Sequence, residues 1–138
     1  MKKYDSQKDT VAHIMRVRKL LFMAREEIMR RGIEHDKSKL CPAEKAGFDE
    51  YTPLLKELTY GSKEYLKVFD KLEEVLEHHY EHNSHHPEHY GADGMNGFDL
   101  FDLIEMFFDW CAATERHADG NITRSIIYNT SRFQMPTQ

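Results

Sequence analysis

The hydrophobic positions of this chain recur mainly at helical spacing, and no segment alternates in the way that a β-strand does. Apolar residues spaced by three and four predict a first helix from about residue 9 or 10 to residue 31, which Gly32 should end. A short helix or turn is expected over residues 35–40. Pro42 should then begin a second helix that covers roughly residues 43–57, with an interruption at Thr52-Pro53.

The remaining pattern predicts three more helices and one long loop. A helix should begin after Ser62 and end near His82, and residues 83–97 should form a glycine-containing loop of the kind that often carries function. The next helix should cover residues 98–113 behind an Asn96 cap, with Asp99 as the acidic member of a capping pair. It is apolar on nearly every side, so we expect it to be buried. A weaker helix is expected over residues 123–133.

The sequence therefore predicts an all-α fold, a compact single domain of about five to six helices over residues 1–138. The 40% hydrophobic and 31% charged content is typical of a globular protein. No apolar run approaches the ~20 residues that span a membrane, and Met1-Lys2-Lys3 is not followed by the apolar segment of a secretory leader. Two cysteines are too few for a disulfide scaffold, so a reducing cytoplasm is the expected location.

The charge is distributed unevenly along the chain. Residues 1–45 carry a formal charge of +5 and residues 46–138 carry −10, which gives the net −5. An acidic total argues against binding to a long nucleic acid. The basic first third can attract a small phosphorylated ligand, or it can simply be a solvated helix face.

Three segments carry side chains that suit a metal ion. His13 shares a helix stripe with apolar residues, His35-Asp36 follows the first helix, and Asp109 lies inside an aromatic helix segment. Each has an ordinary alternative: a hydrogen-bonded core histidine for His13, and an ion pair with Arg116 or an exposed edge for Asp109. Taken together, inward imidazoles and carboxylates from several helices predict a site for a divalent cation.

Six of the nine histidines lie in residues 78–89. His79 continues the apolar stripe of its helix, and His86 shares its face if the helix persists, so these two can complete a second metal position. Pro87 disfavours a helical His86, and His85 is then the substitute. The alternative is a surface cluster that binds metal adventitiously.

The order of His13, His35-Asp36, the histidine cluster and Asp109 resembles the HD-domain superfamily of helical metal-dependent phosphohydrolases. The blocks HDKSKL, NSHHPEH and EMFFDW also resemble a small uncharacterised family that is frequent in phage and bacterial genomes. The resemblance implies that His13, His35, Asp36 and Asp109 bind metal and that Lys39 contacts a substrate phosphate. It places the protein in the cytoplasm of a bacterium or a phage-infected cell, and a homodimer of the HD type is a further expectation.

The leading hypothesis is hydrolysis of a phosphoester or phosphoanhydride in a nucleotide-like small molecule, with one or two ions of Mn, Zn, Co, Ni or Fe. Asp36 would orient the attacking water, Lys39 would neutralise phosphoryl charge, and a nearby histidine would protonate the leaving oxygen. We assign this last role to His85; the other candidates are His82, His86 and His89.

Two other functions fit the same residues. The ligand order also resembles HD proteins that hold two irons and oxidise C–H or C–P bonds with dioxygen, through His13, His35, Asp36, His79, His86 and Asp109. A non-enzymatic, metal-stabilised module that binds a host or defence protein is the third hypothesis. A large exposed apolar patch around Tyr90, Phe98 or Phe101 would suit this hypothesis.

Overall fold

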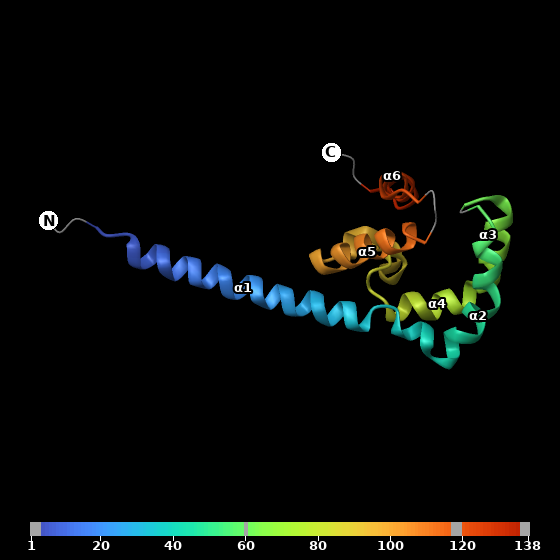
Figure 1. Cartoon of the computed structure of the whole chain (residues 1–138), viewed down its shortest axis with the longest axis horizontal. Coiled ribbons are helices and arrows are strands. Elements are labelled where there is room, and N and C mark those ends of the chain that lie inside the picture. Colours follow the sequence, from blue (N-terminus) through green and yellow to red (C-terminus); the bar gives the residue numbers. More distant parts are fainter. Residues whose placement is uncertain (1–3, 60, 117–119, 136–138) are drawn as a thin grey trace. The chain divides into compact units, whose positions relative to one another are not determined.

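The computed structural model describes residues 4–59, 61–116 and 120–135, and all regular secondary structure in these ranges is helical. The predicted all-α fold is therefore confirmed (Figure 1). Residues 1–3, on which the expectation that the chain has no secretory leader is based, lie outside these ranges. The chain divides into two units, residues 1–34 and residues 35–138. The expectation of a single domain stays a prediction.

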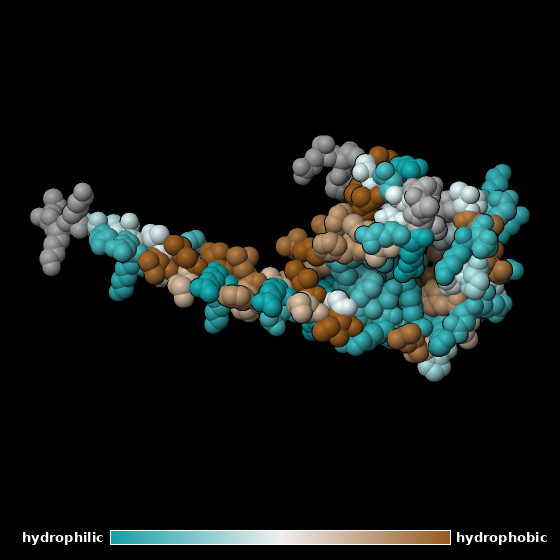
Figure 2. All heavy atoms as spheres, in the orientation of Figure 1, coloured by the Kyte–Doolittle hydropathy of each residue, from teal (hydrophilic) through white to brown (hydrophobic). Residues whose placement is uncertain are grey.

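The first unit consists of helix α1, Gln7–Glu34. Apolar and charged side chains alternate along it at helical spacing, and Figure 2 shows brown hydrophobic residues between teal polar ones over its length. None of its residues is buried. The prediction that Gly32 ends this helix is wrong, because the chain first adopts the left-handed conformation at Asp36, with φ 57° and ψ 12°.

The second unit begins with the 3₁₀-helix η1, Lys37–Leu40, followed by α2, Pro42–Lys56. Pro42 lies at the start of α2, as predicted, since its missing N–H is not needed in the first turn. The predicted interruption at Thr52-Pro53 is wrong: Pro53 lies inside the helix. Both Pro53 and Asp49, whose carbonyl loses its helical partner, are exposed, so water can replace the missing bond.

The predicted third helix is divided into three parts, α3 (Lys63–Phe69), η2 (Asp70–Leu72) and α4 (Glu73–His82). Ser62 caps α3, because its side chain accepts a hydrogen bond from the backbone N–H of Tyr65 at 3.1 Å. Helix α2 packs against both α3 and α4. This pairing brings the first turn of α2 next to the histidines of α4.

The segment predicted as a loop forms 3₁₀ turns, η3 (Pro87–Gly97), with positive φ at Gly91 and Gly94. Helix α5, Leu100–Thr114, follows, and α6, Ile122–Arg132, packs on it. The predicted Asn96 cap is wrong. Asp99 caps α5 itself, in a reciprocal capping box with Asp102.

The fully buried side chains of the described residues are mostly polar. Leu72, Met106 and Pro87 are the buried apolar residues, whereas the buried polar ones are Glu44, His79, Asn83, His85, Asp102 and Asn129. On α5 only Asp102 and Met106 are buried, so the prediction of a buried helix, made from its apolar composition, is wrong. Burying a polar group costs free energy unless it finds a partner. Within the described ranges, no helix is both long and apolar enough to cross a membrane.

Candidate metal centre

The backbone at Asp36 turns the His-Asp pair toward one point. A left-handed conformation is uncommon for a residue with a Cβ, and such residues are often found at functional sites. The Asp36 carbonyl accepts the Lys39 N–H at 2.9 Å and thereby begins η1. The adjacent side chains of His35 and Asp36 therefore do not diverge as they would on a regular helix: His35 Nε2 lies 3.6 Å from Asp36 Oδ2.

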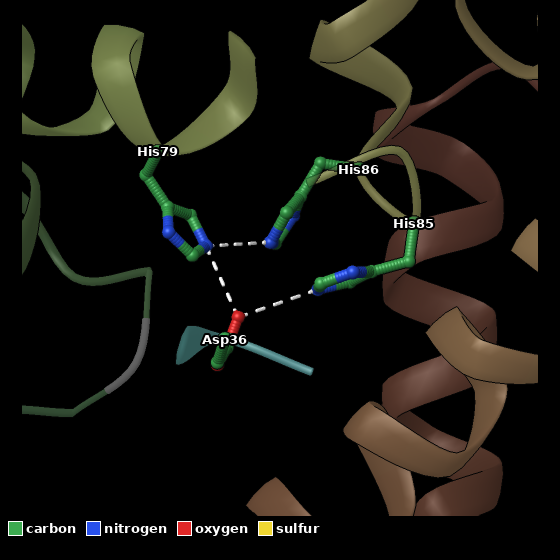
Figure 3. A group of neighbouring side chains, drawn as sticks. All are labelled: Asp36, His79, His85 and His86. Carbon is green, nitrogen blue, oxygen red and sulfur yellow. Dashed lines mark hydrogen bonds and ion pairs between the residues drawn. The ribbon is translucent and has the colours of Figure 1, made fainter. Parts of the chain in front are cut away.

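Three histidines from the α4 region surround the Asp36 carboxylate (Figure 3). His79 Nε2 lies 3.3 Å and His85 Nε2 lies 3.5 Å from the same oxygen, Asp36 Oδ1. His86 Nε2 lies 3.0 Å from His79 Nε2. One ligand atom from each of the four side chains lies within 4.8 Å of the other three, so they can hold a cation.

A second group lies beside the first and shares His85 with it. It consists of His35, His85 and Asp109, whose ligand atoms also lie within 4.8 Å of one another. Asp109 comes from α5, and its Oδ1 is 3.6 Å from His35 Nε2. We call the two groups together the first cluster: His35, Asp36, His79, His85, His86 and Asp109. It offers enough ligand atoms for one or two ions.

Two glutamates, the buried Glu44 and the partly buried Glu105, hold three of these imidazoles by their other nitrogen. The Oε1 atom of Glu105 accepts from His35 Nδ1 at 2.9 Å and lies 3.1 Å from His85 Nδ1. Glu44 Oε2 accepts from His79 Nδ1 at 2.9 Å. A carboxylate on Nδ1 fixes the tautomer that presents Nε2 as a metal ligand, and this arrangement is usual around protein-bound metals.

Two buried atoms at the centre of the first cluster have no hydrogen-bond partner: Asp36 Oδ1 and His85 Nε2. They lie 3.5 Å apart, within ion-pair distance but without hydrogen-bond geometry. Unsatisfied buried polar atoms are costly and rare. A cation bound to Asp36 Oδ1 would satisfy this oxygen, so the residues present fit a metal ion.

The electrostatics of the first cluster separate its members by charge. Burial alone would raise the pKa of Asp36, but the His79 and His85 imidazoles and the Lys39 ammonium hold it well below its usual range. The contacts with Asp109 and then Glu105 raise the pKa of His35 to about 10. The pKa of His86, in contrast, is lowered.

Burial, followed by the neighbouring His85 and His79, lowers the pKa of His86 to about 3. His86 is therefore neutral and ready to donate a lone pair. Burial would also raise the pKa of Asp109, but the contact with His35 outweighs it and lowers that pKa. Both carboxylates of the first cluster are thus ionised, as metal ligands must be.

The structure brings together all but one of the predicted site residues. Lys39 Nζ lies 2.5 Å from Asp36 Oδ2, at the edge of the first cluster. His85 and His86, which the sequence left as alternatives, both belong to the cluster. His13 lies on α1, in the other unit, so its predicted role as a ligand stays a prediction.

The alternative proton donors His82 and His89 and the aromatic residues of the predicted patch are not members of the first cluster. Among the alternative proton donors, His82 Nδ1 contacts the His78 carbonyl at 2.8 Å and His89 Nδ1 contacts the Tyr80 carbonyl at 2.7 Å; both side chains are exposed. The three aromatic residues considered for an exposed patch, Tyr90, Phe98 and Phe101, are each partly buried.

Sequence reasoning missed the two glutamates that orient the histidines. Glu105 precedes Asp109 by four residues on one helix, a spacing that puts two carboxylates on the same face. This spacing could have identified Glu105 from the sequence as a second carboxylate beside Asp109. Glu44 offered none, since an acidic residue in the first turn of a helix is usually explained by the helix dipole.

Comparison with known proteins gives a family but no characterised relative. Neither the curated proteins nor the solved structures include a match to this chain. Residues 2–138 match the model of a family described as "Family of unknown function (DUF5662)". Because the match covers nearly the whole sequence, the chain belongs to the DUF5662 family.

Proposed function

We propose that this protein is a metal-dependent phosphohydrolase that acts on a nucleotide or a related small phosphoester. The observation that carries the proposal is the convergence of four imidazole Nε2 atoms on Asp36 and Asp109, with glutamates on the Nδ1 atoms of three of these imidazoles. The resemblance of the His-Asp order to the HD superfamily supports the same reaction class.

In this proposal His35, Asp36 and Asp109 hold one cation. His79 and His86 with Asp36 can hold another. A divalent cation at such a site polarises a phosphoryl oxygen and makes a water molecule a stronger nucleophile at neutral pH. The ions expected for these imidazole and carboxylate ligands are Mn, Zn, Co, Ni or Fe.

The protein residues have separate tasks around the substrate. Lys39 is more than one-third exposed and is paired with Asp36, so its ammonium can turn to a phosphoryl oxygen and neutralise charge there. Asp36 orients the attacking water by accepting a hydrogen bond from it. His85 is held by Glu105 at Nδ1, and its buried Nε2 faces the first cluster. Burial would lower the pKa of His85, but the contacts with Asp36 and Glu105 outweigh it and raise that pKa. In this proposal His85 is therefore not a ligand but an imidazolium, which gives its Nε2 proton to the leaving oxygen.

The test begins with metal content and phosphate release from a panel of nucleotides, on tag-free protein purified without oxygen. We expect one or two equivalents of metal, released phosphate, and loss of both in Asp36→Ala. Lys39→Ala should keep the metal but lose activity. Lys45→Ala is the matched control, because Lys45 forms an exposed pair with Asp49 on the surface of α2.

Other outcomes would favour the other two functions. Two irons that are lost in Asp36→Ala, together with dioxygen consumption in place of phosphate release, would indicate the diiron oxygenase. Specific metal binding without either activity would indicate a metal-stabilised binding module. Absence of any specific metal after reloading would overturn both enzyme hypotheses.

A further inference from the structure

A third group of metal-ligand side chains lies at the beginning of α2, outside the first cluster. Cys41 directly precedes this helix, Glu44 lies in its first turn, and His78 belongs to α4. One ligand atom of each residue lies within 4.8 Å of the other two. We call these three residues the Cys41 cluster. They come from two helices that pack against each other.

The carboxylate of Glu44 is the centre of this group. Its side chain is fully buried, and its two oxygens face different histidines: Oε1 lies 2.7 Å from His78 Nδ1, and Oε2 lies 2.9 Å from His79 Nδ1. Glu44 is therefore a carboxylate ligand that the two histidines already hold in place.

The thiol of Cys41 is available for binding. Cys41 occupies the N-cap position of α2, yet its side chain makes no capping hydrogen bond, and it is a free cysteine that is partly buried. His78 is about one-third exposed, so the group is open to solvent and a cation can enter it.

We propose that Cys41, Glu44 and His78 form a second cation site with a preference for zinc. A thiolate, an imidazole and a carboxylate are the three ligand types that zinc takes in proteins, and water would complete a tetrahedron. The two anionic ligands would neutralise the charge of the ion. Ligand atoms around tetrahedral zinc lie roughly 3.3 to 3.8 Å apart. The Glu44 and His78 atoms, now 2.7 Å apart, must therefore separate, while a pair near the 4.8 Å limit must close by about 1 Å.

This site is chemically distinguishable from the first cluster, which contains no sulfur ligand. The experiment loads metal-free, reduced full-length protein with Co²⁺ and records its absorption spectrum. We expect a near-ultraviolet thiolate-to-cobalt charge-transfer band in the wild type and its loss in Cys41→Ser, with one fewer equivalent of bound metal. Cys111→Ser is the matched control: it removes the other free cysteine, on α5, and should keep the band.

A second measurement distinguishes the loss of a metal site from a folding defect in Cys41→Ser. Zinc should slow the reaction of Cys41 with a maleimide in the folded wild type, while Asp36→Ala should behave in the same way because its Cys41 cluster is intact. Circular dichroism of Cys41→Ser verifies that the helices remain.

The outcomes separate this site from the proposed function. Cobalt that binds without a thiolate band, or a band that survives Cys41→Ser, overturns the Cys41 site and leaves the first cluster untouched. A band that persists while no metal is lost in Asp36→Ala supports the Cys41 site and counts against the first cluster.

Discussion

Removal of the Glu105 carboxylate should weaken metal binding at the first cluster although Glu105 itself touches no metal. A single oxygen, Oε1, lies 2.9 Å from His35 Nδ1 and 3.1 Å from His85 Nδ1, so one side chain orients two imidazoles. Loss of such a supporting carboxylate typically reduces metal affinity 10- to 100-fold, which is about 1.4 to 2.7 kcal/mol.

The size of the effect should depend on what replaces the carboxylate. Glu105→Ala leaves both Nδ1 atoms without their acceptor, and we expect a loss near the ~100-fold end of that range. Glu105→Gln keeps a neutral oxygen that can accept one or both N–H groups, so its loss should be closer to ~10-fold. The assay is competition with a chromophoric zinc chelator at fixed pH.

Glu115→Gln is the control for this series, since Glu115 is an exposed residue at the end of the same helix. Its affinity should equal that of the wild type. The reasoning is refuted if Glu105→Ala binds zinc within about twofold of the wild type, far inside the range above. An equal loss of zinc affinity in Glu115→Gln would also refute the reasoning, since removal of any carboxylate from α5 would then weaken zinc binding.

Two further predictions concern pH and packing. Because the pKa of His35 is raised to about 10, the folded metal-free protein holds a proton there that a metal must displace. Zinc affinity should therefore rise by about tenfold per pH unit for each proton released between roughly pH 7 and 9. The same proton stabilises the metal-free fold fully below its unfolded pKa, and this stabilisation is lost as the pH rises through about 10. Calorimetry in buffers of different ionisation enthalpy measures the released protons, and a flat affinity profile would contradict the prediction. On α2, a Cβ at Gly47 would lie 2.6 Å from Val75 Cγ2, so Gly47→Ala should destabilise the fold by about 1–3 kcal/mol in chemical denaturation. Gly32→Ala, which meets nothing within 4 Å on α1, should instead stabilise its helix by about 0.5–1 kcal/mol.

The helices themselves could be predicted because their apolar spacing is strong, whereas their ends depended on competing local signals. Nothing lies within 4 Å of a Cβ placed at Gly32, so no contact there forces the helix to end. Helix α1 continues to Glu34, and the left-handed conformation follows at Asp36. Asn96 and Asp99 are both good N-caps; the carboxylate of Asp102 supports Asp99 through a reciprocal hydrogen bond. Sequence spacing alone does not decide between such caps.

The candidate site could be predicted to the extent that its ligands are rare residues in apolar surroundings. His79 and Asp109 stood out because a polar group on an apolar face requires a partner. The supporting residues could not be found in the same way. Glu44 approaches His79 only because α2 packs against α4, a tertiary contact that no local pattern in the sequence encodes.

Glu44 also makes the two candidate sites thermodynamically dependent on each other. One carboxylate serves His78 through Oε1 and His79 through Oε2, so any movement of it toward one cluster is a movement away from the other. A zinc ion that draws Glu44 toward Cys41 would loosen the support of His79 and weaken the first cluster. By linkage, metal at the first cluster must weaken zinc binding at Cys41 by the same factor. The affinity for a cation at one site would then depend on whether a cation occupies the other site.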